Sequence, residues 1–181
     1  MKNKTMLGKY ELLEKIGSGG MAEVYKARLT GIEGFQKIVV VKIILPAYSK
    51  NRSFIEMLVE EAKMTSALQH SNIVQTFELG QHDNQHYLAM EYVDGRDLLR
   101  LLSVCAKKKT PPPQEFICHI ISEVCKGIHH AHNAHGIGGE PLGIIHRDVS
   151  PSNIIISKGG NIKIMDFGVA KAQSQDAKNS K

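Results

Sequence analysis

The fold of this chain is decided by the stretch His146-Arg147-Asp148-Val149-Ser150-Pro151-Ser152-Asn153, which is followed, thirteen residues after its end, by Asp166-Phe167-Gly168. Transfer of a phosphoryl group to a hydroxyl needs one carboxylate to take the hydroxyl proton and polar oxygens to hold Mg²⁺. Asp148 fits the first role, and Asn153 and Asp166 fit the second. Each motif alone arises often by chance, so the prediction depends on the residues upstream.

A glycine-rich segment near the N-terminus reads Gly17-Ser18-Gly19-Gly20-Met21-Ala22-Glu23-Val24. Glycines let backbone N–H groups approach phosphate oxygens without obstruction by side chains. The flanking pattern predicts strand, turn and strand, which argues against a dinucleotide site of the Rossmann type. Ala22 stands where the pattern G-x-G-x-x-G-x-V has its last glycine. Taken alone the segment is a weak signal, since many such loops are simple turns.

A lysine follows eighteen residues after Val24, at the end of Val39-Val40-Val41-Lys42. A lone lysine on a strand is usually a solvated charge. One that lies between apolar strand positions, downstream of a glycine-rich hairpin, can reach nucleotide phosphates if a carboxylate holds it. Glu61, inside an apolar helical pattern, is the candidate for that carboxylate. Glu56 and Glu60 compete with it, since they lie on the same predicted helix.

Hydrophobic periodicity divides the chain into two parts that join near residues 91–94. The first part has five strands and one helix, and the second has helices and a small hairpin. Turn residues, with prolines foremost among them, mark the boundaries. We expect, in order, three antiparallel strands within residues 9–45, a helix over 52–68, strands over 73–79 and 86–93, a short helix from Arg96, a helix over 114–135, and two strands flanking 158–160.

In combination these motifs make the sequence resemble the protein kinase family, and the bacterial eukaryotic-like Ser/Thr protein kinases in particular. The resemblance covers about residues 8–172. It implies an α+β, protein-kinase-like fold, with a five-stranded antiparallel N-terminal lobe that carries one helix, and a partial helical C-terminal lobe. It is carried by GSGGMAEVYKA (17–27), VVVK (39–42), the spacing of Glu61 and His70 with Asn72-Ile73-Val74, MEYVDG (90–95), PLGIIHRDVSPSN (141–153) and KIMDFGVAK (163–171).

The resemblance also implies a domain organisation. Family members continue with an Ala-Pro-Glu segment, a substrate platform and further helices, whereas this sequence ends at Lys181, thirteen residues after Gly168. We therefore expect a chain truncated after the Asp-Phe-Gly segment, either a natural short protein or a fragment of a longer one. The expected parts are a flexible N-terminus at 1–8, an N-lobe and hinge at 9–93, a partial C-lobe with the catalytic loop at 94–171, and a disordered activation segment at 172–181.

Carried over position by position, the resemblance assigns roles to the site residues. Asp148 positions or deprotonates the substrate hydroxyl, and Asn153 and Asp166 hold Mg²⁺. Lys42, paired with Glu61, contacts the phosphates of ATP. The nucleotide-binding residues implied are Ile16, Gly17, Ser18, Gly19, Gly20, Val24, Val40, Lys42, Met90, Glu91, Val93, Asp97 and Ile155.

The contacts implied within that set differ. Met90 lies at the back of the adenine pocket, and the backbones of Glu91 and Val93 face adenine. Asp97 faces the ribose. The residues that sandwich the base are Ile16, Val24, Val40 and Ile155.

Besides Ala22, two positions depart from the family pattern. Val40 replaces the usual alanine, which narrows the roof of the adenine pocket by two methyl groups. Ser150 replaces the lysine that contacts the transferred phosphate in Ser/Thr kinases, and loss of one such electrostatic donor can cost roughly 10²–10³ in rate. Pro151 still favours the Ser/Thr over the Tyr version of the loop. Ser150 is therefore included among the candidate catalytic residues.

The function implied by the resemblance is phosphorylation of Ser or Thr hydroxyls of proteins, with ATP and Mg²⁺ as cofactors. The alternative is a catalytically weak, kinase-derived module that binds nucleotide or a partner protein, because the C-terminal lobe is incomplete. A small-molecule phosphotransferase is a third and weaker interpretation, since His146-Arg147-Asp148 with Pro151 follows the protein-kinase style.

Composition limits the other classes of function. The net charge of +5, from 23 Lys+Arg and 18 Asp+Glu, suits a polyanionic ligand, but no nucleic-acid motif accompanies it. The basic run Lys107-Lys108-Lys109 is expected to be a solvated loop, with a docking patch as the alternative. No apolar run approaches the length of a membrane span, and no signal core begins the chain.

Three cysteines, Cys105, Cys118 and Cys125, form no paired framework. This fits a reducing compartment, and we expect cytoplasmic localisation. Cys118 and Cys125 lie seven residues apart on a predicted helix, so they share a face that we expect to be buried. The incomplete lobe should leave an apolar face of the 114–135 helix exposed, through which the chain would self-associate.

Overall fold

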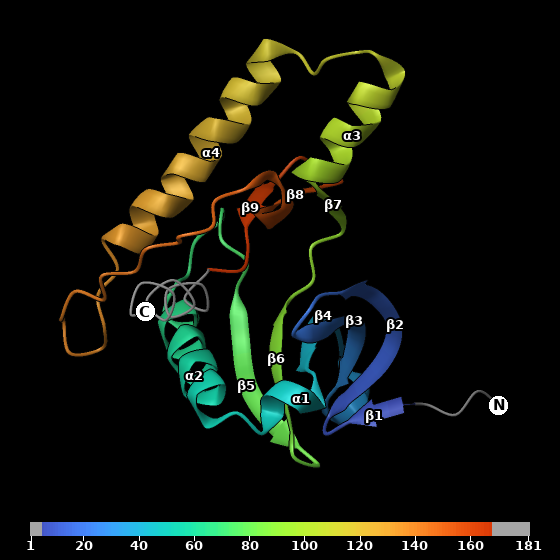
Figure 1. Ribbon diagram of the computed structural model, residues 1–181, viewed down its shortest axis with the longest axis vertical. Helices are drawn as coiled ribbons and strands as arrows, with labels where there is room; N and C mark the ends of the chain where they lie inside the picture. Colours follow the sequence, from blue (N-terminus) through green and yellow to red (C-terminus); the bar gives the residue numbers. More distant parts are fainter. Residues whose placement is uncertain (1–4, 168–181) are drawn as a thin grey trace, which may run out of the picture. The chain divides into compact units, whose positions relative to one another are not determined.

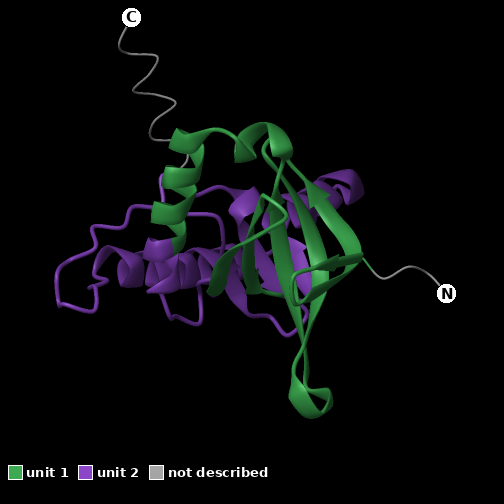
Figure 2. Ribbon diagram, turned by 90° about the horizontal axis from the view of Figure 1, so that it is seen from below, with its two compact units in different colours: residues 1–62, 76–92 green, residues 63–75, 93–181 purple. Residues whose placement is uncertain are grey.

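The computed structural model describes residues 5–167, and the chain divides into two compact units (Figure 2). Unit 1 comprises the residues up to Ala62 together with Thr76–Tyr92. Unit 2 comprises Lys63–Gln75 and the residues from Val93 onward. Each unit has its own hydrophobic core, so each is described by itself.

These units are not the two contiguous lobes, 9–93 and 94–171, that the sequence leads us to expect. The segment between the two parts of unit 1 belongs to unit 2, because its Leu68 and Ile73 are buried in the core of that unit. The expected activation segment at 172–181 lies outside the described residues.

Unit 1 contains an antiparallel sheet of six strands in the order β1-β2-β3-β4-β6-β5 (Figure 1). The sequence pattern predicts five of them. The additional strand, β1, corrects the expectation of a flexible end at 1–8, since its three residues pair with β2 and its Leu7 is buried. The strands are β1 (Thr5–Leu7), β2 (Tyr10–Ser18), β3 (Ala22–Thr30), β4 (Gln36–Ile44), β5 (Thr76–His82) and β6 (Gln85–Glu91).

The strand β4 shows why this sheet forms. It is rich in β-branched residues, and successive side chains of a strand point to opposite faces. Val39, Val41 and Ile43 are buried in the main core of unit 1 with residues of β2, β3 and β6. Val40 and Lys42 therefore lie on the opposite face of the sheet.

Two helices follow β4. The first, α1 (Pro46–Ser49), is a single turn that the sequence pattern does not reveal, and Pro46 occupies its first position. The second, α2 (Arg52–Ser66), ends two residues before the predicted end. It begins after Asn51, whose side-chain oxygen accepts a hydrogen bond of 3.1 Å from the backbone N–H of Phe54. Such a bond satisfies one of the N–H groups that a helix start leaves without a partner.

Unit 2 contains two long helices, a 3₁₀ turn at Pro151–Asn153 and a sheet in the order β7-β8-β9. The strand β7 stands where the sequence predicts a turn and a helix start. Gly95 permits its close pairing with β8, because a Cβ there would lie 2.1 Å from the carbonyl oxygen of Ile156. The elements are β7 (Gly95–Asp97), α3 (Leu98–Lys108), α4 (Gln114–His132), β8 (Ile154–Ser157) and β9 (Ile162–Ile164).

The helix α4 packs one face against β9. Its buried residues, Ile120, Val124, Gly127 and Ala131, recur at helical spacing. Gly127 lets the two elements approach, since a Cβ there would lie 2.9 Å from Cδ1 of Ile164. The core of unit 2 is thus built where α4 meets the strand that leads to Asp166.

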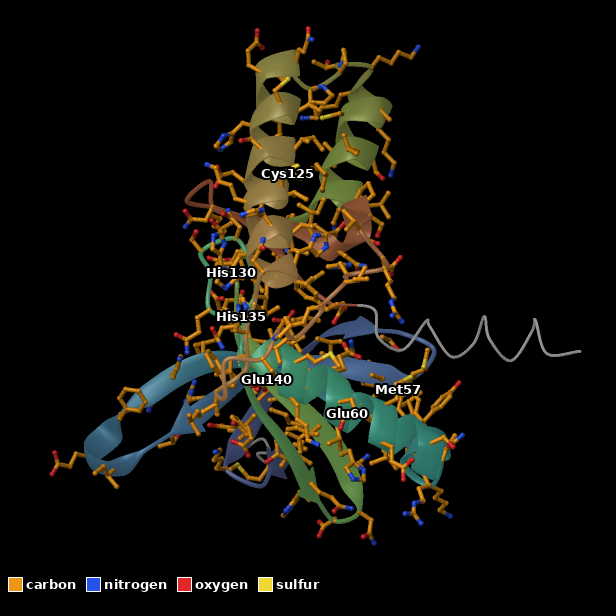
Figure 3. The ribbon with its side chains drawn as sticks, turned by 90° about the vertical axis from the view of Figure 1, so that its left-hand side faces the viewer. Met57, Glu60, Cys125, His130, His135 and Glu140 are labelled. Carbon is orange, nitrogen blue, oxygen red and sulfur yellow. The ribbon has the colours of Figure 1, made fainter. Side chains whose placement is uncertain are left out.

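The prediction that Cys118 and Cys125 are buried is wrong, because both are exposed. Figure 3 labels Cys125 on α4. Each residue turns a helix by about 100°, so a seven-residue spacing does place both thiols on one side. The inward side is instead set by Ile120 and Val124, and the cysteines are out of phase with it.

The helix α4 ends at His132, three residues before the predicted end. The side-chain amide of Asn133 donates a hydrogen bond of 2.8 Å to the carbonyl oxygen of His129 and closes the last turn. Among residues 5–167, no helix combines the length and the apolar composition that a membrane span requires.

Candidate active site

The imidazole of His146 holds the catalytic loop of unit 2 together. It is 1% exposed. Its Nε2 donates to the carbonyl oxygen of Met165 at 3.2 Å, and its Nδ1 accepts from the backbone N–H of Asp148 at 3.3 Å. Its ring also packs on Phe167, with ring centroids 4.5 Å apart. One side chain therefore joins Asp148 to the residues on both sides of Asp166.

These contacts require a neutral imidazole, with one ring nitrogen that donates and one that accepts. Burial lowers the pKa of His146 below its usual value, although the Met165 carbonyl and the carboxylates of Asp148 and Asp166 act in the opposite direction. The neutral form is thus the one that the fold favours. Its role is to support the loop rather than to move a proton.

The side chain of Asn153 fixes Asp148 directly. Its Nδ2 donates to the Asp148 carbonyl oxygen at 2.9 Å and to the carboxylate Oδ2 at 3.0 Å. The backbone carbonyl of Asn153 accepts from the N–H of Met165 at 2.9 Å. Because the amide nitrogen holds Asp148, the amide oxygen is the atom of Asn153 that could bind a cation.

Two residues of this site have a backbone conformation that is rare outside glycine. Arg147 has φ 59° and Asp166 has φ 55°. Such conformations cost energy, and they persist where surrounding contacts impose them. His146 precedes Arg147 and Met165 precedes Asp166, and these two preceding residues are joined by the hydrogen bond from the His146 ring to the Met165 carbonyl oxygen. The backbone of Asp148, Asn153 and Asp166 is thereby held in one part of unit 2.

In unit 1 the predicted phosphate and adenine residues share one face of the sheet. Val24 lies opposite Lys42 in the register of β3 and β4, and Val40 lies opposite Met90 in that of β4 and β6. Because Val40 and Lys42 are two residues apart on one strand, all four side chains lie on the face opposite the main core of unit 1.

The helix α2 packs on this same face. Its Leu58 is buried with Ala22 and Ile44, and Ile44 lies two residues beyond Lys42 on β4. Glu61 follows Leu58 by three residues, which places it on the same side of the helix. The carboxylate predicted to serve Lys42 therefore lies on the side of α2 that faces the strand of Lys42.

The glycine-rich hairpin joins β2 and β3. Among the described residues, a Cβ at Gly20 would meet nothing within 4 Å, and a Cβ at Gly17 or Gly19 would meet its nearest neighbour at 3.5 or 3.8 Å. The fold of the chain therefore does not require glycine at these positions. A ligand that approaches the backbone would require it.

For the other residues predicted to contact the nucleotide, the structure gives a position in or beside a strand. Ile16 lies at a bulge of β2 and is 46% exposed. Glu91, the last residue of β6, lies opposite Val39. In unit 2, Asp97 lies opposite Ile155 in β7 and β8. Val93 is the first residue of unit 2 after the second part of unit 1.

Asp97 also has a structural role that the sequence analysis does not assign. Its carboxylate accepts a hydrogen bond of 2.7 Å from the backbone N–H of Arg100 and caps α3. Ser150 likewise has a local contact, since its hydroxyl lies 2.8 Å from the hydroxyl of Ser152. Neither residue is placed by these bonds against Asp148.

Asn72, which the sequence analysis names only as part of the resemblance, is a buried residue that supports the site. Its Nδ2 donates to a carboxylate oxygen of Glu123 on α4 and to the carbonyl oxygen of Ile162, both at 2.9 Å. Its own carbonyl accepts from the N–H of Ile164 at 2.8 Å. It thus fixes β9, which runs directly into Met165 and Asp166. A buried asparagine beside apolar residues is the signal that could have found it.

Each comparison of this chain with known proteins finds protein kinases. The family model described as "Protein kinase domain" matches residues 10–181. The tyrosine-protein kinase MasK of Myxococcus xanthus is 39% identical over 168 residues, which cover 93% of this chain and 26% of that protein. The serine/threonine-protein kinase PrkC of Bacillus subtilis is 36% identical over 171 residues, which cover 94% of this chain and 24% of that protein.

A solved structure shares the fold. The kinase domain of Mycobacterium tuberculosis PknI superposes with a TM-score of 0.74 at 25% sequence identity, covering 93% of this chain and 63% of that chain. The chain thus spans about a quarter of the length of the two curated relatives and under two thirds of the solved domain.

Proposed function

We propose that this chain, which belongs to the protein kinase family, carries the ATP-binding and catalytic-loop residues of an enzyme that phosphorylates hydroxyl groups of proteins. The observation that carries the proposal is the set of hydrogen bonds that fixes Asp148. The Asn153 amide bonds both its backbone and its carboxylate, and Met165 bonds both Asn153 and His146. A carboxylate that is fixed in this way has one orientation, which suits it to accept a proton from a substrate hydroxyl.

In the proposed mechanism, Asp148 accepts a hydrogen bond from the attacking hydroxyl and takes its proton as the phosphoryl group is transferred. Asn153, through its amide oxygen, and Asp166 would hold Mg²⁺, which would neutralise the phosphate charge. Lys42, oriented by Glu61, contacts the phosphates. The backbone of the hairpin covers them, which is why its glycines have room to spare.

The adenine site would be formed by the apolar residues on the face of the unit 1 sheet opposite its main core, together with the hinge backbone. Val24, Val40 and Met90 share that face. Glu91 and Val93 would offer backbone groups to the base. The remaining residues proposed to contact the nucleotide are Ile16, Gly17, Ser18, Gly19, Gly20, Asp97 and Ile155.

We propose Ser and Thr as the acceptors. Pro151 and the name of PrkC favour them, whereas the name of MasK, which is the more identical of the two relatives, favours Tyr. Tyrosine is therefore the second candidate. Incubation with Mg²⁺, radiolabelled ATP and matched peptides that differ only in Ser, Thr or Tyr separates the two, with Asp148→Asn as the blank. Label on none of the peptides would count against the function of this chain.

We also propose cytoplasmic localisation, supported by three cysteines of which none forms a disulfide in the described structure. Self-association is proposed through the outer side of α4, where Phe116 and Ile121 are exposed. Light scattering should show concentration-dependent oligomers that Ile121→Ser weakens. A monomer at all concentrations would remove this proposal without affecting the enzymatic one.

A further inference from the structure

Residues at the C-terminal end of α3 and just after it line a pocket of about 420 Å³. Figure 1 shows this segment where the chain turns from α3 toward α4. The proposed phosphoryl transfer does not use this pocket. Its volume lies within the range of about 300–1,000 Å³ that is common for ligand pockets, although it is largely open to solvent. It is lined mainly by carbon atoms, from Leu102, Cys105, Ala106, Lys109, Thr110, Pro111 and Pro112.

The wall of this pocket is fixed by the way α3 ends. Lys109 is left-handed, with φ 53°, and its N–H donates to the carbonyl oxygen of Ala106 at 3.1 Å. The N–H of Thr110 donates to the carbonyl oxygen of Cys105, also at 3.1 Å. The prolines that follow have a restricted φ. A wall that is already rigid needs little ordering when a ligand binds.

The surroundings of the pocket are strongly basic. Lys107, Lys108 and Lys109 are all exposed beside it, and residues 98–114 include Arg100 but no acidic residue. Lysines in the last turn of a helix also stabilise it through the helix dipole. That role alone would not explain why an apolar pocket lies next to them. Glu115, in the first turn of α4, is the nearest acidic residue that follows.

We propose that this pocket binds an apolar side chain of an acidic protein segment, with the three lysines steering the acidic residues that flank it. Opposite charge increases the rate of encounter, and a buried apolar anchor supplies most of the affinity. A single-stranded nucleic acid fits less well, because it is held by stacking on aromatic side chains, and the described residues that line the pocket include none.

The segment would belong to a protein substrate held at unit 2 while its hydroxyl reacts elsewhere. That recruiting role rests on the proposed function. The binding itself does not, since it is measured without ATP, so its failure and the failure of phosphoryl transfer are separate results.

The test is fluorescence anisotropy with the whole chain and a short labelled peptide in which Leu-Phe is flanked by glutamates. Lys108→Glu should weaken binding about tenfold, and Ala106→Trp, which fills the pocket and keeps the charges, should do the same. The matched control is Lys50→Glu, an equal charge reversal on unit 1, which should change affinity less than about twofold. Replacing Leu-Phe by Ser-Ser in the peptide should abolish binding.

Cys105 provides a second readout from inside the pocket. In a Cys118→Ser/Cys125→Ser chain it is the remaining cysteine of the three. Bound peptide should slow its reaction with monobromobimane. An unchanged rate, equal binding of the Ser-Ser peptide, or equal binding of oligo-dT would each overturn the proposal, the last two because the lysines would then be a general patch for polyanions.

Discussion

The glycine-rich hairpin of unit 1 and the catalytic loop of unit 2 are built in opposite ways. At the hairpin tip, the N–H of Gly19 donates a hydrogen bond of 2.9 Å to the carbonyl oxygen of Ala22. Side chains would fit at Gly19 and Gly20. In the loop, the side chains of His146 and Asn153 are bonded to the backbone around Asp148 and Asp166. The hairpin tip therefore has space for larger side chains, whereas the catalytic loop is already filled by its own side chains.

This difference separates what the chain needs in order to fold from what it needs in order to bind. The sequence of the loop is explained by its own contacts, so changes there should alter stability or turnover. The glycines of the hairpin have no such explanation in the described fold. If they serve the proposed nucleotide site, changes there should alter nucleotide affinity and leave the fold intact.

The largest effect is expected at Asp148. Asp148→Asn keeps the shape of the side chain but removes the proton acceptor, so phosphate transfer should fall by roughly 10²–10⁴. Affinity for Mg·ATP should stay nearly unchanged, because the hairpin and Lys42 are untouched. Single-turnover kinetics and equilibrium binding measure the two quantities separately. Turnover at the level of the unmodified chain would remove Asp148 from the mechanism.

The next effect concerns the support of the loop. His146→Ala leaves the Met165 carbonyl and the Asp148 N–H without their partner and opens a cavity, so the chain should lose about 2–4 kcal/mol of stability. Urea unfolding measures it. The matched control is His132→Ala, an exposed histidine of α4, with an expected change of less than about 0.5 kcal/mol. Equal losses for the two variants would refute the supporting role.

A pair of glycine variants sharpens the comparison between the two units. Gly20→Val should weaken Mg·ATP binding about tenfold with little change in stability, because the described fold has room for the side chain. Gly127→Ala should cost about 1–3 kcal/mol, because its Cβ would press on Ile164, and should leave the affinity unchanged. The opposite pairing of effects would show that the hairpin glycines serve the fold.

Acidification should loosen unit 2. The folded pKa of His146 is lowered, so as the pH falls below about 6.5 the unfolded chain takes up a proton that the native chain does not, and stability declines until the folded pKa is reached. Burial lowers the pKa of His70 as well, so it adds to the same trend. Urea midpoints at several pH values should therefore fall less steeply for His146→Gln. An identical slope would exclude His146 as a source of the dependence.

The smallest effect is expected at Ser150, whose hydroxyl contacts Ser152. Ser150→Lys restores the positive charge found at this position in the family. We expect less than about a threefold gain in kcat toward a protein substrate, since positioning of the hydroxyl contributes more to the barrier than one donor does. A gain of ten-fold or more would identify the missing charge as the limit on the rate.

Sequence reasoning succeeded where a pattern is long or chemically specific. The β-branched run that ends near Lys42 predicted the strand β4, and the spacing from Asp148 to Asp166 drew attention to residues that contact or flank the contacts of His146 and Asn153. The three-residue strands β1 and β7 escaped detection, since so few residues carry almost no periodicity.

The remaining errors have tertiary causes. The phase of α4 is set by β9, so the sequence spacing of Cys118 and Cys125 could not show that their side faces outward. The role of His146 depends on a carbonyl nineteen residues away, and that of Asn72 on a strand ninety residues away. Bonds of this kind follow from the fold and have no local signature.

The division of labour between hairpin and loop is the central claim, and equilibrium titration of Mg·ATP into Gly20→Val and Asp148→Asn, beside the unmodified chain, tests it most directly. The account predicts that Gly20→Val binds about tenfold more weakly and that Asp148→Asn binds within about twofold of the unmodified chain. Unimpaired binding by Gly20→Val, with a clear loss in Asp148→Asn, would contradict it.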